Sequence, residues 1–233
     1  MSSGTLDRGF ARGNDLMQRH IRDVVRPTTF TLLGDEWTLL SGVFAPTHTP
    51  VTELFTSWIP YPVGGTFLEV GSGAGVTAVV AARSGCRAVT AVDISPAAVE
   101  NTRRNAQRHG VSDRLRVLKS DLFDALDPVE RFDVIFWNSN FVEPPPGYVN
   151  ETDFHHAFFD PDYRTHGRYA REGPRRLTEG GRLLLGFSDL GNRARLEELA
   201  AGVGLEVVTV RAESRTAEIP IEFQLLELRR REG

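Results

Sequence analysis

Short runs of apolar residues alternate with amphipathic segments along most of the chain. Most runs stop at a polar residue or a glycine, and several are followed by a segment whose apolar positions recur at helical spacing. The runs predict strands at 66–70, 87–92, 115–119, 132–137, 182–187, 205–210 and 221–228. The segments predict helices at 49–59, capped by Thr49, and at 75–84, 95–109, 165–177 and 193–201. Such alternation is typical of a parallel sheet with crossover helices.

Both ends of the chain depart from this alternation. The last two runs are joined by polar residues 212–217, which predicts an antiparallel hairpin at the edge of the sheet. Near the start, the first dozen or so residues are polar and predict an arm, and residues 15–25 predict a short helix. The runs on either side of residues 34–36 predict a small hairpin. We therefore expect residues 1–45 to act as a lid over the substrate, and residues 46–233 to form one α/β domain.

The composition limits the class of protein. A chain of 233 residues with 40% apolar and 25% charged residues suits one globular domain with a short extension. No apolar run is long enough to span a bilayer and none marks a signal peptide, so we expect a cytoplasmic protein. The formal net charge of -4 argues against a general nucleic-acid binder. The single cysteine, Cys86, excludes an internal disulfide and a cysteine-based zinc cluster.

A glycine-rich turn follows the first strand of the predicted sheet. Residues 67–75 read F-L-E-V-G-S-G-A-G, which places glycines at 71, 73 and 75. This G-x-G-x-G spacing lacks the third glycine of the G-x-G-x-x-G fingerprint of dinucleotide folds. Ligands of a doubly wound sheet bind outside the carboxyl ends of its strands, where this turn lies. The turn therefore predicts a nucleotide-like ligand that is not a dinucleotide.

Three polar residues end the next strands and so converge on the same edge of the sheet. Asp93 lies 22 residues after Gly71, close to the spacing of about 20 at which an acidic residue reaches a ribose hydroxyl. Asp121 and Asn138 end the third and fourth strands. Either aspartate alone could be a helix N-cap. Two of them on neighbouring strands, behind a glycine-rich turn, favour a bound nucleoside.

Residues 67–75 resemble motif I of class I S-adenosylmethionine (SAM) methyltransferases. Residues 132–141 are similar to the N-P-P-Y motif IV of the HemK-like branch, whose members act on planar nitrogens. The likeness extends over roughly residues 30–228. It implies an α/β, Rossmann-like fold: a seven-stranded, mostly parallel sheet of order 3-2-1-4-5-7-6, with helices on both faces and an antiparallel edge hairpin.

The same resemblance implies SAM as the cofactor. Asp93 would bind the ribose, Asp121 the adenine amino group, and the backbone of the glycine-rich turn the methionine part. The cofactor-binding residues implied by the resemblance are Glu69, Gly71, Ser72, Gly73, Gly75, Asp93, Ile94, Asp121, Leu122 and Asn138.

Motif IV departs from the family pattern. Asn138 is retained, but Ser139 and Asn140 replace both prolines, and the aromatic residue is Phe141. By resemblance, the side-chain oxygen of Asn138 would hold an acceptor N–H group and Phe141 would stack against the acceptor. A turn residue at the end of a strand is the simpler interpretation of Asn138. The missing prolines leave the family's glutamine or adenine acceptor unassigned.

A long polar and aromatic segment, residues 143–166, lies where substrate loops of such sheets are found. His155 or His156 could act as a general base toward a hydroxyl nucleophile. Surface histidines on a lid are the alternative. Asp153 and Asp160 could join the histidines as metal ligands, but by resemblance a metal-dependent enzyme would belong to another branch, so we expect no metal.

These observations predict a SAM-dependent methyltransferase that acts on a nitrogen or oxygen of a small-molecule acceptor. The negative net charge and the altered motif IV favour a small molecule over a macromolecule. A protein-glutamine or nucleic-acid N-methyltransferase is the first alternative, and a SAM-binding protein without catalysis is the second. Nucleic acid and membrane are not expected as partners, and a homodimer is left open.

Overall fold

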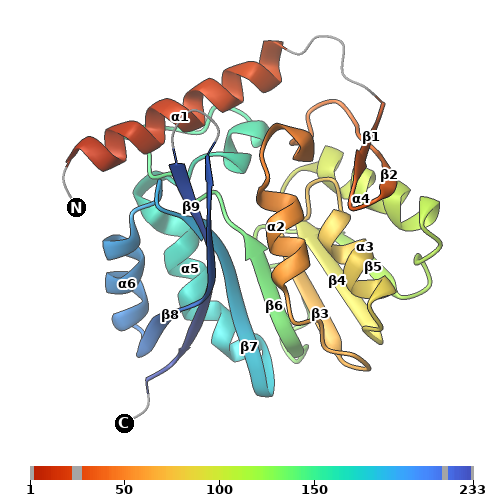
Figure 1. Cartoon of the computed structure of the whole chain (residues 1–233). Helices are drawn as coiled ribbons and strands as arrows, with labels where there is room; N and C mark the ends of the chain where they lie inside the picture. Colours follow the sequence, from red (N-terminus) through yellow and green to blue (C-terminus); the bar gives the residue numbers. More distant parts are fainter. Residues whose placement is uncertain (1–2, 23–27, 217–219, 232–233) are drawn as a thin grey trace.

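The computed structural model describes residues 3–22, 28–216 and 220–231 and is built around a seven-stranded sheet (Figure 1). The strands are β3 (Thr66–Val70), β4 (Ala88–Asp93), β5 (Leu115–Lys119), β6 (Phe132–Asn138), β7 (Leu177–Ser188), β8 (Leu205–Thr216) and β9 (Pro220–Arg230). Their order is β5-β4-β3-β6-β7-β9-β8. Strands β3 to β7 are parallel, and β9 is antiparallel to both β7 and β8. The predicted fold class and strand order are confirmed.

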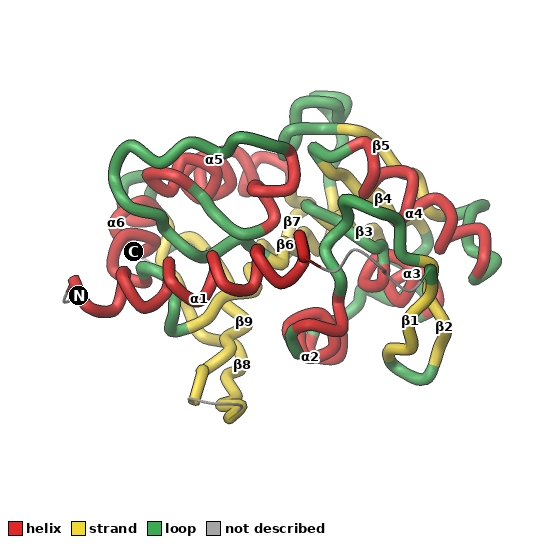
Figure 2. The backbone as a smooth tube through the Cα atoms, turned by 90° about the horizontal axis from the view of Figure 1, so that it is seen from above, coloured by secondary structure: helices red, strands yellow, loops and turns green. Residues whose placement is uncertain are grey.

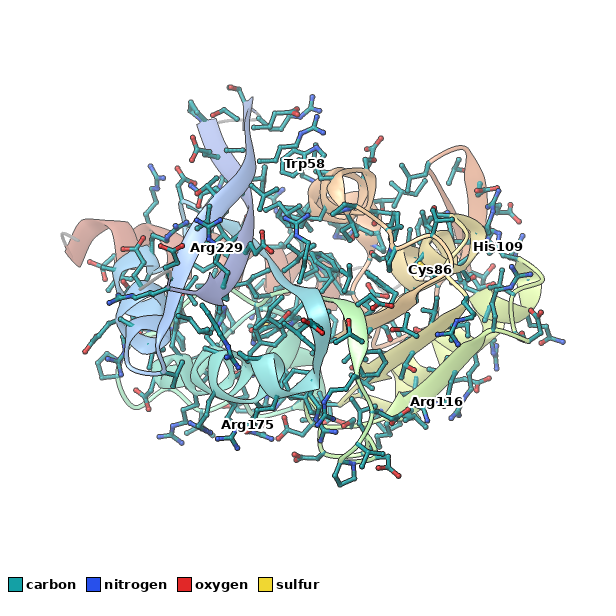
Figure 3. All side chains as sticks on the ribbon, turned by 90° about the horizontal axis from the view of Figure 1, so that it is seen from below. Trp58, Cys86, His109, Arg116, Arg175 and Arg229 are labelled. Atoms are coloured by element: carbon teal, nitrogen blue, oxygen red, sulfur yellow. The ribbon has the colours of Figure 1, made fainter. Side chains whose placement is uncertain are left out.

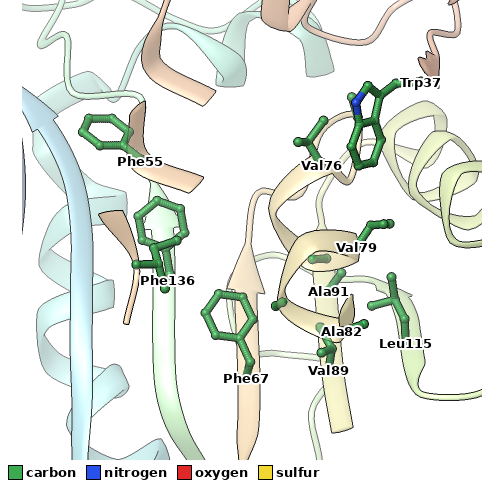
Figure 4. Packing of buried hydrophobic residues seen from close by; sticks show 14 of the residues in the cluster. Trp37, Phe55, Phe67, Val76, Val79, Ala82, Val89, Ala91, Leu115 and Phe136 are labelled. Atoms are coloured by element: carbon green, nitrogen blue, oxygen red, sulfur yellow. The ribbon is translucent and has the colours of Figure 1, made fainter. Parts of the chain in front are cut away.

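Helices cover both faces of this sheet. They are α1 (Ser3–Arg22), α2 (Val51–Trp58), α3 (Val76–Arg83), α4 (Pro96–Arg108), α5 (Arg164–Glu172) and α6 (Arg193–Ala201), with short 3-10 turns η1 (Pro46–His48), η2 (Asp153–Ala157), η3 (Pro161–Tyr163) and η4 (Gly173–Arg176). Phe67 belongs to a hydrophobic cluster that includes α2, α3 and α4, and Figure 4 shows it together with side chains of α2 and α3. Its neighbour Leu68 belongs to the cluster that includes α5 and α6 on the opposite face. Because neighbouring strand residues point to opposite faces, central strands are apolar throughout.

The N-terminal segment is one long helix, α1, and this corrects two expectations. The first dozen residues, predicted as a polar arm, are helical from Ser3 onward, and the helix predicted to start at Asp15 starts at Ser3. Gly9 and Gly13 lower intrinsic helix propensity, but they let α1 approach its neighbours closely. A Cβ on Gly9 would lie 2.4 Å from the Leu190 carbonyl oxygen, and one on Gly13 would lie 2.9 Å from the Phe159 ring. The predicted end of that helix, Val25, lies outside the described residues.

Figures 1 and 2 show α1 lying across the end of the sheet at which the parallel strands terminate. The small hairpin, β1 (Thr29–Leu32) and β2 (Asp35–Thr38), lies elsewhere, against α4. There the side chains of Asn101 and Asn105 bond the backbone of residues 38–40. Among the described residues of the first 45, only α1 and the chain that leads into η1 therefore lie near the carboxyl ends of the strands.

Several predicted boundaries shift. The turn of the small hairpin lies at Leu33–Gly34, where both residues have a left-handed backbone. It therefore begins one residue before the predicted turn at residues 34–36. Helix α2 begins at Val51 with Pro50 at its N-cap, so Thr49 does not cap it. Residues 212–216, predicted as a turn, continue β8, because the partner residues of β9 extend its ladder to Pro220. Residues 173–177, predicted as helical, form η4 and the start of β7.

Candidate active site

A cavity of about 670 Å³ opens at the carboxyl ends of β3, β4, β5 and β6, beneath α1. Most of the residues predicted from sequence line it together: Glu69, Gly71, Ser72, Gly73, Asp93, Ile94, Asp121, Leu122, Asn138, Phe141 and His156. Gly75 and His155 are not part of its lining. The structure thus gathers in one place residues that are spread over about 90 positions of sequence, as doubly wound sheets do.

The glycine turn, residues 71–75, has a left-handed backbone at each of its three glycines. At Gly73 a Cβ would meet nothing within 4 Å, so this residue borders open space on the cavity side. At Gly75 a Cβ would lie 2.8 Å from the Thr102 backbone of α4. The two glycines therefore serve different needs: Gly73 leaves room for a ligand, and Gly75 lets the turn pack against α4.

Asp93 ties the glycine turn to the end of β4. One carboxylate oxygen accepts the Gly73 N–H at 2.9 Å, and the other accepts the Ser95 N–H at 2.9 Å. The side chain is 9% exposed, and this burial raises the pKa of Asp93 even though both backbone hydrogen bonds lower it. Each oxygen keeps a further lone pair, so the carboxylate can still accept hydroxyl groups from the cavity.

Glu69 lies deeper, on β3, and is 3% exposed. One carboxyl oxygen accepts the N–H of Ala78 on α3 at 2.8 Å. Burial raises the pKa of Glu69 from 4.5 to about 8, and hydrogen bonds from Thr77 and Ala78 offset only part of that shift. The cofactor-free protein therefore holds Glu69 mainly protonated at neutral pH.

Replacing Glu69 with glutamine should flatten the pH dependence of stability. A folded-state pKa above the unfolded value means that the stabilisation is complete below about pH 4.5 and is lost as the pH rises toward about 8. Between about pH 4 and 7, the free energy of unfolding of the wild type should fall by on the order of 3 kcal/mol relative to Glu69→Gln. Urea unfolding of both cofactor-free proteins measures this difference, and parallel pH curves would contradict it.

Asp121 is held by a residue that the sequence did not suggest. The Arg168 guanidinium on α5 contacts one Asp121 oxygen at 2.8 Å, and it also contacts Asp124 at 2.9 Å and Glu172 at 3.2 Å. The second Asp121 oxygen has no partner among the described residues, and Asp121 lines the cavity. The next residue, Leu122, is buried with a left-handed backbone, a strained conformation of the kind found at ligand sites.

The motif IV turn, residues 138–141, follows β6 directly. Asn138 is half-buried, and its side-chain amide has no hydrogen-bond partner among the described residues. The Ser139 hydroxyl donates to the Gly186 carbonyl at 2.7 Å, and the Tyr163 hydroxyl donates to the Phe141 carbonyl. Hydrogen bonds thus hold the turn at Ser139, where the resembling family has a proline, and at Phe141.

The two histidines predicted as bases occupy different positions. The Nδ1 atom of His155 accepts the Glu151 N–H at 3.1 Å, away from the cavity lining. His156 lines the cavity, and its Nδ1 atom lies 3.1 Å from the Asn150 amide nitrogen. A base role for either histidine stays a prediction, and His156 is the one that reaches the site.

A buried pair, Asp160 and His166, lies behind the cavity wall. The His166 Nδ1 atom is 2.6 Å from an Asp160 oxygen, and its ring stacks on Tyr163 and lies against Trp137, which lines the cavity. Burial acts to raise the pKa of Asp160, but the hydrogen bond and charge of His166 outweigh it and lower that pKa. Both residues belong to the predicted substrate segment, residues 143–166, and nothing in the sequence indicates that they pair.

A family model described as the methyltransferase small domain matches residues 36–200. The chain belongs to the methyltransferase small domain family. It is therefore a class I, SAM-dependent methyltransferase, and its cofactor is SAM. The matched residues include the glycine turn, both aspartates of the strand ends and the motif IV turn.

Two relatives of this methyltransferase are named for protein acceptors. The release factor glutamine methyltransferase of Rhodopirellula baltica is 35% identical over 133 residues, which cover 54% of this chain and 45% of the relative. The ribosomal protein L11 methyltransferase of Tolumonas auensis is 38% identical over 99 residues, 41% of this chain and 32% of the relative. The chain spans less than half the length of these curated relatives.

A solved structure shares the fold. A methyltransferase complexed with S-adenosylhomocysteine (SAH) matches 87% of this chain and 56% of its own, with a TM-score of 0.55 and 16% sequence identity. Across the described residues, no helix is long and apolar enough to cross a membrane. The same residues contain no group of three or more histidine, cysteine or acidic side chains placed to hold a metal ion.

The expected small-molecule acceptor is wrong. The matched relatives are named for a glutamine of a release factor and for ribosomal protein L11, which are macromolecular acceptors. Neither the net charge nor the altered motif IV turn excludes a protein acceptor. A net charge of -4 does not disfavour a protein partner, and the motif IV turn keeps internal hydrogen bonds without its prolines.

Proposed function

We propose that this methyltransferase transfers a methyl group to the side-chain amide nitrogen of a glutamine in a protein. The observation that carries the proposal is the amide of Asn138, which has no partner in the described part of the chain and lies at the end of β6 in the same cavity as the glycine turn. Its oxygen can accept an N–H of an acceptor amide. The 35% identity to a release factor glutamine methyltransferase and the N-x-x-aromatic form of the motif IV turn support the same acceptor and the HemK-like branch.

The residues proposed to hold SAM fit its chemistry. The open space beside Gly73 admits a ligand close to the backbone, and Asp93 and Asp121 offer carboxylate oxygens toward the cavity. The cofactor supplies an electrophilic methyl group. The contribution of the chain is then to bind both reactants, to orient the acceptor nitrogen through Asn138 and to exclude water with the surrounding walls.

A protein acceptor is favoured over a nucleic acid because the arginines that line the cavity, and several on α4 and β5, are already paired. On α4 and β5, Arg104, Arg108 and Arg116 form ion pairs with Glu100, Glu36 and Glu130. Arg116 and Arg175 lie on the side of the molecule opposite α1 (Figure 3), away from the cavity. Phosphate binding needs accessible cations close to the reacting base. Of the four arginines that line the cavity, Arg19, Arg164 and Arg168 contact Asp15, Asp162 and Asp121, and Arg12 is not free either.

Incubation with methyl-labelled SAM tests the proposed acceptor. The purified enzyme is mixed with a release factor, with ribosomal protein L11 and with total RNA from the same cells. We expect a single added methyl group on a glutamine of the release factor, located by fragmentation mass spectrometry. Label on the L11 protein alone, on RNA alone, or on none of the three would overturn the glutamine proposal.

The lid expected in residues 1–45 is proposed to be α1. One face of the helix docks through Gly9, Gly13 and Met17, while Arg12 and Leu16 on a neighbouring face line the cavity. His20 completes the docked face: it is 1% exposed, and its Nε2 atom accepts the Ala45 N–H at 3.1 Å. A helix held in this way would have to shift for a large acceptor to enter.

Replacing Gly9 with alanine should loosen α1. The new Cβ would lie 2.4 Å from the Leu190 carbonyl oxygen, which as backbone cannot yield, although alanine by itself favours a helix. Hydrogen exchange of the α1 amides should rise about tenfold, which corresponds to about 1.4 kcal/mol of local opening. The control is Asn14→Ala, on the exposed face of the same helix. Equal exchange rates in both variants would argue against a tightly docked lid.

A further inference from the structure

Two residues that line the cavity have buried polar atoms without a hydrogen-bond partner among the described residues: Thr49 Oγ1 and Asn140 Oδ1. A hydroxyl can rotate to find a partner. The amide of Asn140 is fixed, because its Nδ2 atom donates to the His156 carbonyl at 3.0 Å and to the Phe159 carbonyl at 2.8 Å. Only the nitrogen can face two carbonyl groups, so the position of the oxygen follows from the hydrogen bonds themselves.

The unpaired oxygen of Asn140 calls for an explanation. The residue is 8% exposed, and a buried acceptor without a donor is costly and uncommon in folded proteins. In the resembling family this position is a proline, which has no side-chain oxygen. Stiffening of the turn needs only the hydrogen bonds of Nδ2. It therefore does not explain why this side chain also has an oxygen.

The surroundings of Asn140 place it at the acceptor end of the cavity. Both carbonyls that it bonds belong to the segment 153–160, whereas the glycine turn is bonded to Asp93. An aromatic wall of Phe44, Phe154 and Phe158 belongs to the same lining. The ring centroid of Phe158 lies 5.1 Å from that of Phe154 and 5.6 Å from that of Phe44. In such apolar surroundings a hydrogen bond to a ligand discriminates strongly, because water cannot replace it.

We propose that the side-chain oxygen of Asn140 accepts a hydrogen bond from an N–H group of the methyl acceptor. Asn140 is then an acceptor-binding residue that selects acceptors with an N–H donor. The inference rests on the proposed function for the amide nature of the acceptor. The proposal adds the side-chain oxygen of Asn140 to that of Asn138. In the resembling family this position is a proline, which has no side-chain oxygen.

Carbon-13 NMR on the wild type tests this without a protein acceptor. The enzyme, labelled at its asparagine side-chain carbonyls and saturated with SAH, is titrated with propionamide and with N,N-dimethylpropionamide, and the Asn140 signal is assigned with Asn140→Asp. Propionamide should shift the Asn140 carbonyl signal, and the dimethyl compound, which has no N–H, should not. An Asn140 signal that stays still with both compounds, or that moves equally with both, overturns the proposal whether or not proteins are methylated.

Steady-state kinetics with the protein acceptor separate binding from loop stiffness. Asn140→Ala should raise the KM of the acceptor at least about tenfold, with an SAH Kd within about twofold of wild type. Ser139→Ala, which removes only the brace to Gly186, should lower kcat with an unchanged acceptor KM. If Asn140→Ala, like Ser139→Ala, lowers kcat and leaves the KM of the acceptor unchanged, the role of Asn140 is only structural. If it instead raises the SAH Kd, the donor is the cofactor's ammonium group. Either result overturns the proposal.

Discussion

Replacing Asn138 with alanine is expected to lower kcat about a thousand-fold. The variant loses a cavity-lining side chain of the motif IV turn whose amide has no partner among the described residues. Without that oxygen, an amide acceptor can still enter, but its nitrogen is no longer held in line with the methyl group. Single-turnover methyl transfer with saturating SAM measures the effect. The SAH Kd, measured by calorimetry, should stay close to that of the wild type.

The matched control for this variant is Asn192→Ala. Asn192 caps α6 by accepting the Arg195 N–H at 3.1 Å, and it is not part of the cavity lining. Its loss should cost about 1 kcal/mol of stability and leave kcat unchanged. If Asn138→Ala turned over the true acceptor within a few-fold of the wild type, Asn138 would be a turn residue and the proposed orientation of the acceptor would be wrong.

Local signals explain what could be predicted. A buried parallel strand needs apolar residues on both faces, so Phe67 and Leu68 are consecutive and the strand is visible in sequence. A left-handed turn favours glycine, and Gly73 marks it. Asp93 and Asp121 follow their strands directly, so chain direction alone brings them to one edge of the sheet.

Tertiary packing decided what could not be predicted. Gly9 and Gly13 are poor helix formers in isolation, and only the approach of Leu190 and Phe159 shows why α1 carries them. Arg168 meets Asp121 from a different helix, and charge alone does not select this arginine among the many in the chain. The bracing of the motif IV turn by Ser139 and Asn140 likewise depends on carbonyls that are distant in sequence.

Replacing Asp93 with alanine is expected to raise the SAH Kd about a thousand-fold. Hydrogen bonds to a charged group contribute about 1.5–3 kcal/mol each, and two of them to the ribose hydroxyls would correspond to about three powers of ten. The variant also leaves the N–H groups of Gly73 and Ser95 without their partner, so the glycine turn loses its tie to β4. Calorimetric titration with SAH measures the change, and the folded state is checked by circular dichroism.

Asp133 provides the control, because it has the same chemistry at the other end of the sheet. Its carboxylate accepts the Thr66 N–H at 2.7 Å and the Thr178 hydroxyl at 2.6 Å, and it is not part of the cavity lining. In Asp133→Asn one of the two hydrogen bonds is lost, because the amide nitrogen cannot accept one. The variant should therefore be less stable than the wild type, with an unchanged SAH Kd. If the two variants weakened SAH binding equally, the effect of Asp93 would reflect damage to the sheet and not contact with the ribose.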